Sequence, residues 1–181
     1  MKLALQGLRA VNNVLYRIVA VVAALLVAVM VVVVFGGAAI RNLTGIGFGM
    51  VQELPPMLVP WVVFPMAGVL LRFDAHITVD FLPSLLSSTG VRILRFLVAA
   101  VAVIAGGIFF IAGLEAVSLF RLTGQVTEMD WEFPIWWIYL SFPVGFAMLI
   151  SFAVENMLDA VVGENPEPKH LEDADSPFQT S

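Results

Sequence analysis

Four stretches of the sequence contain no Asp, Glu, Lys, Arg or His, and each is about long enough to cross a membrane. They cover residues 18–40, 54–71, 96–114 and 133–154. A spanning helix needs about 20 apolar residues, because a rise of about 1.5 Å per residue must cover about 30 Å of hydrocarbon. The chain is 60% hydrophobic and 13% charged, whereas soluble domains are about 45–50% apolar and about 25% charged. The sequence therefore predicts an all-α integral membrane protein with four transmembrane helices.

We place these helices at residues 16–40, 52–71, 93–118 and 133–156, within a membrane domain of residues 1–162. A secretory signal peptide would have an apolar core of only about 7–15 residues, and the uncharged run after Arg17 is longer, so we expect an uncleaved first span. Ala20, Ala24 and Ala28 share one helix face, where another helix could approach closely. The alternative is that alanine is simply common in such helices.

The second span contains Pro60 and Pro65 well inside it, and each removes one intrahelical hydrogen bond. A kink is therefore expected there. It would be either a bend that neighbouring helices accommodate or a broken helix that lines an ion site.

The connection after the second span gathers charged residues and a histidine between two apolar runs. The later part of this connection has apolar residues at helical spacing and polar residues at the other positions. The apolar residues are Ile77, Phe81, Leu82, Leu85 and Leu86, and the polar ones are Thr78, Asp80, Ser84, Ser87 and Ser88. This pattern predicts an interfacial amphipathic helix at about 77–90, too short to span the membrane.

Lys and Arg residues indicate the orientation of the chain, since the side that carries more of them usually faces the cytoplasm. Lys2, Arg9, Arg17, Arg72, Arg92 and Arg95 fall on one side and Arg41 and Arg121 on the other. We therefore expect both termini in the cytoplasm. The acidic, proline-containing segment 163–181 is expected to be a disordered cytoplasmic tail.

Candidate catalytic, metal and cofactor residues are few. The chain has no cysteine, and His76, with Asp74 and Asp80, is better explained as a hydrogen-bonded surface histidine than as a metal site or an acid–base pair. Haem would need two axial ligands, but the second histidine, His170, lies in the tail. Glu115, near the outer end of the third span, is expected to reach solvent rather than a partner or a water-filled cleft. We expect no enzyme activity, no catalytic residue, no metal, no cofactor and no nucleic-acid partner.

Two groups of residues give the chain a resemblance to a known family. They are Arg72, His76, Ile77, Val79 and Asp80 after the second span, and Pro134, Trp136, Tyr139, Pro143 and Gly145 at the start of the fourth. In this four-span context they resemble the small membrane subunit of tripartite ATP-independent periplasmic (TRAP) transporters. The resemblance covers residues 10–160 and leaves the tail unexplained.

The resemblance implies a scaffold subunit in the bacterial inner membrane. Its partners would be a large elevator-type membrane subunit, which holds the substrate and sodium sites, a periplasmic substrate-binding protein, and phospholipids. The complex would import an organic anion or a similar solute by symport. Glu128, Asp130 and Trp131 could contact the binding protein, or could form a solvated loop above an aromatic belt. The competing class is a free-standing tetraspan structural or lipid-binding protein, or, less favoured, a membrane enzyme that acts through His76 and Asp80.

Overall fold

The computed structural model describes residues 2–47, 49–72, 88–128 and 132–162. Within these ranges the chain is helical, with α1 (Lys2–Thr44), α2 (Met50–Arg72), α4 (Ser88–Thr123), α5 (Ile135–Tyr139) and α6 (Ser141–Val162). Four segments of the described chain are long and apolar enough to cross a membrane: Leu5–Thr44, Val51–Arg72, Thr89–Thr123 and Ile135–Val162. The predictions of an all-helical chain and of four spans are confirmed. Most of the predicted interfacial segment 77–90 lies outside the described residues, and its last three residues begin α4.

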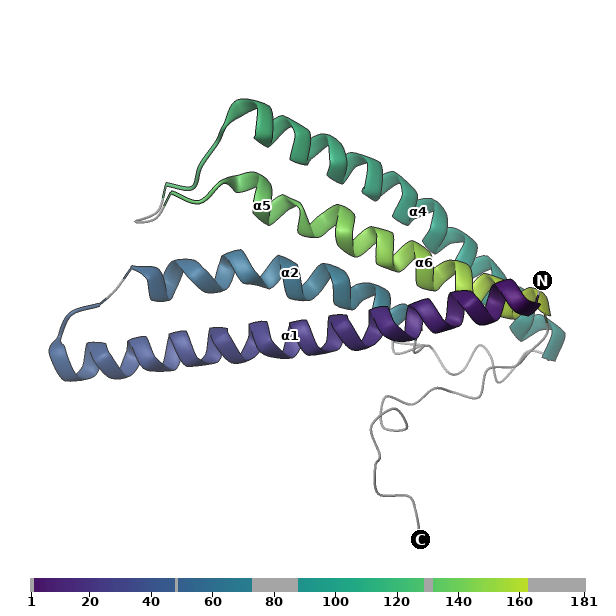
Figure 1. The fold of residues 1–181 in the computed structure, drawn as a ribbon, viewed down its shortest axis with the longest axis horizontal. Coiled ribbons are helices and arrows are strands. Elements are labelled where there is room, and N and C mark those ends of the chain that lie inside the picture. Colours follow the sequence, from purple (N-terminus) through teal and green to yellow (C-terminus); the bar gives the residue numbers. More distant parts are fainter. Residues whose placement is uncertain (1, 48, 73–87, 129–131, 163–181) are drawn as a thin grey trace, which may run out of the picture.

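The helices converge at one end of the molecule and separate toward the other (Figure 1). The N-terminus of α1, the start of α4 and the end of α6 lie together at the convergent end. Helix α6 packs against both α2 and α4, whereas α1 contacts mainly α2. The order of the bundle is therefore α1, α2, α6 and α4, with α1 and α4 at its two outer sides.

Glycines bring α2 and α6 into close contact. A Cβ atom on Gly145 of α6 would overlap the main chain of Phe64, and a Cβ atom on Gly68 of α2 would lie 3.0 Å from the Cα of Leu149. Main chain cannot move aside as a flexible side chain can, so only glycine allows this approach.

Helix α2 continues through Pro60 and Pro65 to Arg72.

Small residues likewise form the contact between α4 and α6. Ala99, Gly106 and Gly113 are buried and follow one another at seven-residue spacing on one face of α4. A Cβ atom on Gly113 would lie 3.0 Å from the Cδ of Pro143 in α6. Small residues therefore allow α4 to pack closely on α6 at these positions, while a Cβ atom on Gly107, on another face, would meet nothing within 4 Å.

Helix α1 contacts the bundle through a different pattern, which we call the α1 seam. Its buried positions and six of its half-buried ones recur at alternating steps of four and three residues: Leu5, Arg9, Asn12, Tyr16, Val19, Ala23, Leu26, Met30, Val33 and Gly37. This is the seven-residue repeat of coiled-coil packing. Leu8, Leu15, Ala20 and Gly36 are half-buried beside this row. On the predicted alanine face Ala20 is half-buried, whereas Ala24 and Ala28 are exposed, so among the described residues no helix packs along that face beyond Ala20.

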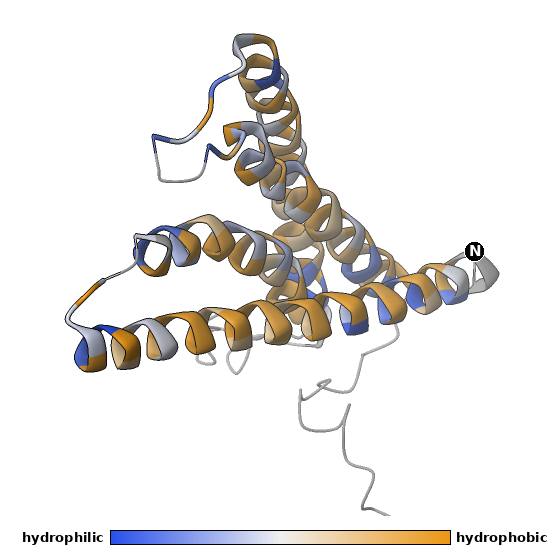
Figure 2. Cartoon of the chain, turned by 60° about the vertical axis from the view of Figure 1, so that its left-hand side comes forward, coloured by the Kyte–Doolittle hydropathy of each residue, from blue (hydrophilic) through white to orange (hydrophobic). Residues whose placement is uncertain are grey.

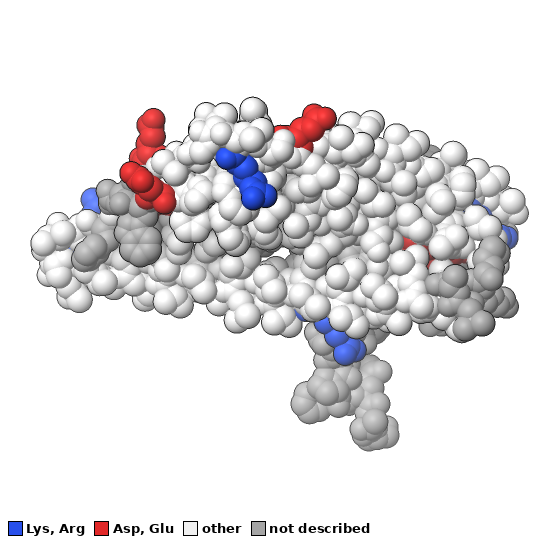
Figure 3. Space-filling model, turned by 45° about the horizontal axis from the view of Figure 1, so that its top comes forward, with Lys and Arg blue, Asp and Glu red and all other residues white. Residues whose placement is uncertain are grey.

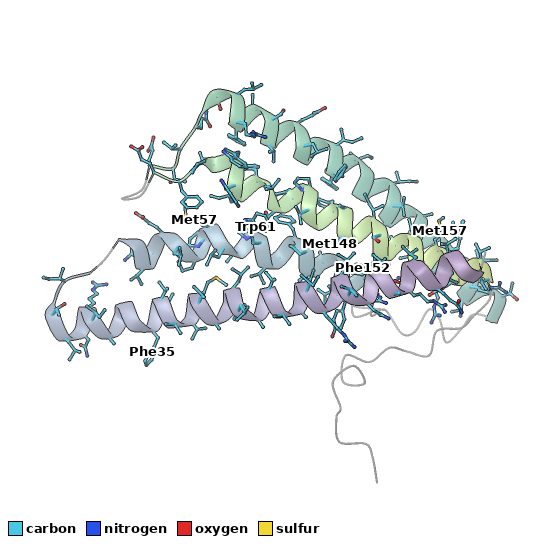
Figure 4. All side chains as sticks on the ribbon, in the orientation of Figure 1. Phe35, Met57, Trp61, Met148, Phe152 and Met157 are labelled. Carbon is cyan, nitrogen blue, oxygen red and sulfur yellow. The ribbon has the colours of Figure 1, made fainter. Side chains whose placement is uncertain are left out.

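The outer surfaces of α1 and α4 are apolar. Hydrophobic residues cover nearly the whole length of α1 (Figure 2), and most of the face shown in Figure 3 carries no charged side chain. Phe35 points away from the other helices (Figure 4) and is 76% exposed. Such a surface would be unstable in water and suits hydrocarbon or another membrane helix.

A proline explains why the fourth span is broken into α5 and α6. Pro143 has no amide hydrogen, so it cannot bond to the carbonyl of Tyr139 four residues earlier. Helix α5 ends at Tyr139, and the amide of Leu140 bonds to the carbonyl of Trp136 at 2.9 Å. Pro134 is the N-cap of α5, with φ −62° and ψ 121°.

Candidate functional site

A cluster of buried polar side chains lies where α1 begins and where α2 and α6 end. Asn12 and Glu155 are 0% exposed and Arg72 is 5% exposed. Ser151, one turn before Glu155 on α6, completes this set, which we call the polar cluster. Helices α1, α2 and α6 each contribute at least one member. A buried charge is tolerated in an apolar bundle only when it is paired and hydrogen-bonded, so the contacts of each group decide what the cluster can do.

Arg72 joins α2 to both other helices. Its Nη2 atom lies 3.2 Å from Oε1 of Glu155 and donates a second hydrogen bond, of 2.6 Å, to Oδ1 of Asn13. Its Nη1 atom donates to the main-chain carbonyl of Asn12 at 2.9 Å. The guanidinium carbon lies 5.5 Å from the ring centre of Phe152. One arginine therefore binds a carboxylate on α6, a carbonyl and an amide on α1, and an aromatic face.

Asn12 completes the network from α1. Its Nδ2 atom donates to Oε2 of Glu155 at 2.6 Å and to the carbonyl of Ser151 at 3.2 Å. Its Oδ1 atom accepts a 2.7 Å bond from Oγ of Ser151. Both carboxylate oxygens of Glu155 are thus bonded within the chain, one to Arg72 and one to Asn12.

Further polar contacts surround the cluster at the same end. Arg9 Nη2 pairs with Oδ1 of Asp159 at 2.7 Å, which again joins α1 to α6. Arg92 at the start of α4 donates from Nε to the carbonyl of Ala160 at 2.8 Å and from Nη2 to that of Val161 at 2.9 Å. The last carbonyls of a helix have no intrahelical partner and carry partial negative charge. Arg92 therefore caps α6 from a different helix.

The opposite end of α4 is closed by a hairpin with aromatic contacts. The amide of Thr127 bonds to the carbonyl of Phe133 at 2.9 Å, and that of Ile135 bonds to the carbonyl of Gln125 at 3.1 Å. Arg121 stacks over Trp136, with 5.1 Å between the guanidinium carbon and the ring centre. These contacts hold together the base of the loop that contains Glu128 and Glu132, which we call the clamped hairpin.

Most of the region that contains the four spans matches a known family. The family model described as "Tripartite ATP-independent periplasmic transporters, DctQ component" matches residues 30–163. The chain belongs to this family. The resemblance inferred from the sequence is therefore confirmed, and this DctQ component is a multi-pass membrane protein of a transporter family rather than of an enzyme family. No curated protein and no solved structure matches the chain.

Six residues of the two groups that carry the resemblance lie within the described chain, at three locations. Arg72 lies in the polar cluster, Pro143 and Gly145 lie in the glycine contacts of α6, and Pro134, Trp136 and Tyr139 lie at the N-cap of α5 and within it. The positions His76, Ile77, Val79 and Asp80 lie outside the described residues, as do Asp130 and Trp131. Glu128 is exposed beside the hairpin.

The sequence interpretation missed three members of the polar cluster. We ended the last span near residue 156 and regarded the spans as free of buried ionisable groups, but α6 continues to Val162, and Glu155 and Asp159 are buried in it. They can be buried because Arg72 and Arg9 pair with them. Asn12 and Ser151 carry no charge and did not stand out. The spacing of Asn12 from Leu5 and Val19, seven residues either way, was the available signal.

The described residues hold no group of three or more His, Asp or Glu side chains placed to bind a metal ion. In the polar cluster each carboxylate oxygen of Glu155 already accepts a hydrogen bond from the chain. The cluster is consequently built to join helices, not to present a free ligand.

Proposed function

We propose that this DctQ component is the small permease subunit of a TRAP transporter and acts as a membrane scaffold for the large subunit. The large subunit would move its transport domain in an elevator-like manner and hold the ion and substrate sites. The observation that carries the proposal is that the buried charges of the polar cluster bond to one another within this chain. A chain that escorted an ion through the membrane would need groups open to that ion.

Packing within the chain supports a static role. Glycine contacts between main chains, as at Gly145 and Gly68, leave little room for α2 and α6 to slide past each other. A scaffold must resist the forces that a moving partner exerts, and tightly packed helices do so better than loosely packed ones. The exposed faces of α1 and α4 remain for lipid and for the large subunit.

The proposed orientation places the polar cluster toward the cytoplasm. The basic residues Arg9, Arg72 and Arg92 lie at the convergent end, and Arg41 and Arg121 lie near the other ends of their helices. The excess of basic residues at the convergent end favours the cytoplasmic side of a bacterial inner membrane. The clamped hairpin with Glu128 would then face the periplasm.

We propose that the acidic hairpin contacts a periplasmic substrate-binding protein. Glu128 and Glu132 are exposed on a loop whose base is held by two main-chain hydrogen bonds, which suits a contact of fixed position. A photo-crosslinker at position 128 should capture the binding protein, whereas one at exposed Thr44, the last residue of α1 on the same proposed side, should capture much less. Equal capture from both positions would contradict the contact.

Reconstitution tests the scaffold role. The chain alone in liposomes should give no sodium-driven uptake of an organic anion, and the same chain with its large subunit and binding protein should give uptake. Uptake by the chain alone would contradict the proposal. A chain that purifies as a stable protein and binds no large subunit would instead support a free-standing tetraspan protein.

A further inference from the structure

The rotational setting of α1, meaning which of its sides faces α2 and α6, is not fixed by hydrophobicity. Helix α1 is apolar on nearly all sides along its membrane-spanning length (Figure 2). Residues off the seam, such as Leu25 and Val32, are as hydrophobic as those on it. Over most of its length, turning α1 about its axis would therefore exchange one apolar contact face for another at small cost. The exception is Gly37 near its far end, where a Cβ atom would overlap the side chain of Val51 in α2.

The connection to α2 restricts sliding of α1 more than its rotation. Residues 45–49 join the two helices, and so short a connection keeps the end of α1 close to the start of α2. It does not determine which side of α1 faces inward. Apolar seam residues alone would also allow other rotational settings, as in coiled coils that lack a polar residue in the core.

Asn12 differs from the apolar residues around α1, because it places a polar side chain at a buried position of the α1 seam. It bonds with its side chain to Glu155 and Ser151 and with its carbonyl to Arg72. A rotation of one residue, about 100°, would remove the amide from these partners. In one direction the rotation would place Val11 against Glu155, which would lose the bond that Asn12 donates. In the other it would bring Asn13 to that place and move its Oδ1 away from Arg72. Either loss of hydrogen bonding is costly for buried charges.

We propose that the polar cluster of Asn12, Arg72, Ser151 and Glu155 sets the rotational setting of α1 in the bundle. Its main role is to select one arrangement, since a buried ion pair adds little net stability compared with apolar residues of similar size. The setting determines which residues of α1 face outward, among them Leu25, Val32 and Phe35. The inference concerns contacts within this chain and does not depend on the proposed partners.

Disulfide trapping measures the setting directly, because the native chain contains no cysteine. Val19 on the α1 seam and Val69 on α2 pack in one apolar group with Phe152. The full chain in nanodiscs would carry cysteine at position 69 and a second cysteine at position 18, 19 or 20. In the native background V19C should form the disulfide at least about tenfold faster than I18C or A20C, because a disulfide requires Cβ atoms about 3.5–4.5 Å apart.

Two variants remove the cluster in different ways. N12L/R72M/E155M replaces the polar members by apolar residues, and N12L/N13A removes the α1 side chains while the Arg72–Glu155 pair stays. Both should reduce the preference for position 19 to less than about threefold, since neighbouring settings become similar in energy. R92M, which removes a polar contact between α4 and α6, should leave the preference unchanged.

Each outcome bears on the proposal. Loss of the preference in both folded variants, with the R92M control unchanged, would support it. A preference kept near tenfold in either folded variant would overturn it. Failure of the fully apolar variant to fold would also overturn it, because the cluster would then be a source of stability rather than of selection.

Discussion

Helices α2, α4 and α6 are joined by glycine contacts along their length, whereas α1 has one such contact, Gly37 against Val51, and is joined at its other end by the polar cluster and the Arg9–Asp159 pair. In the first region, close packing of main chain leaves only one arrangement that fits. In the second, apolar residues occur on nearly all sides of the helix, and specific hydrogen bonds distinguish one arrangement from another. The two regions show that a membrane bundle can obtain a unique structure from shape or from polar pairing.

The largest effect should follow from Glu155→Ala, which breaks the α1 side of this comparison. It leaves Arg72 buried without its carboxylate, at a cost of about 3–5 kcal/mol. In nanodiscs the midpoint of thermal unfolding should fall by at least about 6 °C, at roughly 2–4 °C per kcal/mol for a chain of this size. R72M/E155M should recover much of this loss, because no unpaired charge remains.

Glu115→Ala, at an exposed position on α4, is the matched control for Glu155→Ala, and its unfolding midpoint should change little. A fall in E115A equal to that in E155A would contradict the assignment.

Gly145→Ala should have the next largest effect, and it breaks the glycine side. The new methyl group would overlap the main chain of Phe64, so α2 and α6 must separate. Overpacking of this kind costs about 1–3 kcal/mol, and the unfolding midpoint should fall accordingly. The cysteine at position 69 should still form its disulfide faster with position 19 than with position 18 or 20, because the polar cluster is unchanged. Stability equal to that of the native chain would show that the α2–α6 contact is not close.

The smallest effects should come from the adjacent glycines of α4, and they sharpen the comparison. A methyl group at Gly106 meets the flexible side chain of Ile150 at 2.9 Å, and one at Gly107 meets nothing within 4 Å. Alanine favours a helix over glycine by up to about 1 kcal/mol. Gly107→Ala should therefore raise the unfolding midpoint slightly, and Gly106→Ala should leave it nearly unchanged. Stabilisation by G106A greater than by G107A would be the contrary result.

Much of the fold could be predicted from the sequence, because hydrocarbon imposes a strong constraint. Runs without charged residues predicted the four spans. The alanine spacing of α1 indicated its packing only at half-buried Ala20, since Ala24 and Ala28 are exposed. Alanine is compatible with lipid as well as with a helix, so its presence alone does not distinguish the two.

The polar cluster could not be predicted from the same constraint. The rule that charges avoid the membrane interior ended the predicted last span at about residue 156, but pairing of Glu155 with Arg72 and of Asp159 with Arg9 allows α6 to continue to Val162. Pairing depends on residues more than 80 positions apart in the chain, and hydropathy along the sequence carries no information about it. Arg72 was identified through the family motif, without its partners.

The most direct test of the contrast between α1 and the other helices is a distance measurement by electron spin resonance in nanodiscs. Spin labels at exposed Phe35 of α1 and Ile108 of α4 would report the position of α1, and labels at Val63 of α2 and Ile108 would report the glycine-packed region. In N12L/N13A the first distance distribution should broaden or gain a second peak, while the second stays narrow as in the native chain. An unchanged narrow distribution for the Phe35–Ile108 pair would contradict the account.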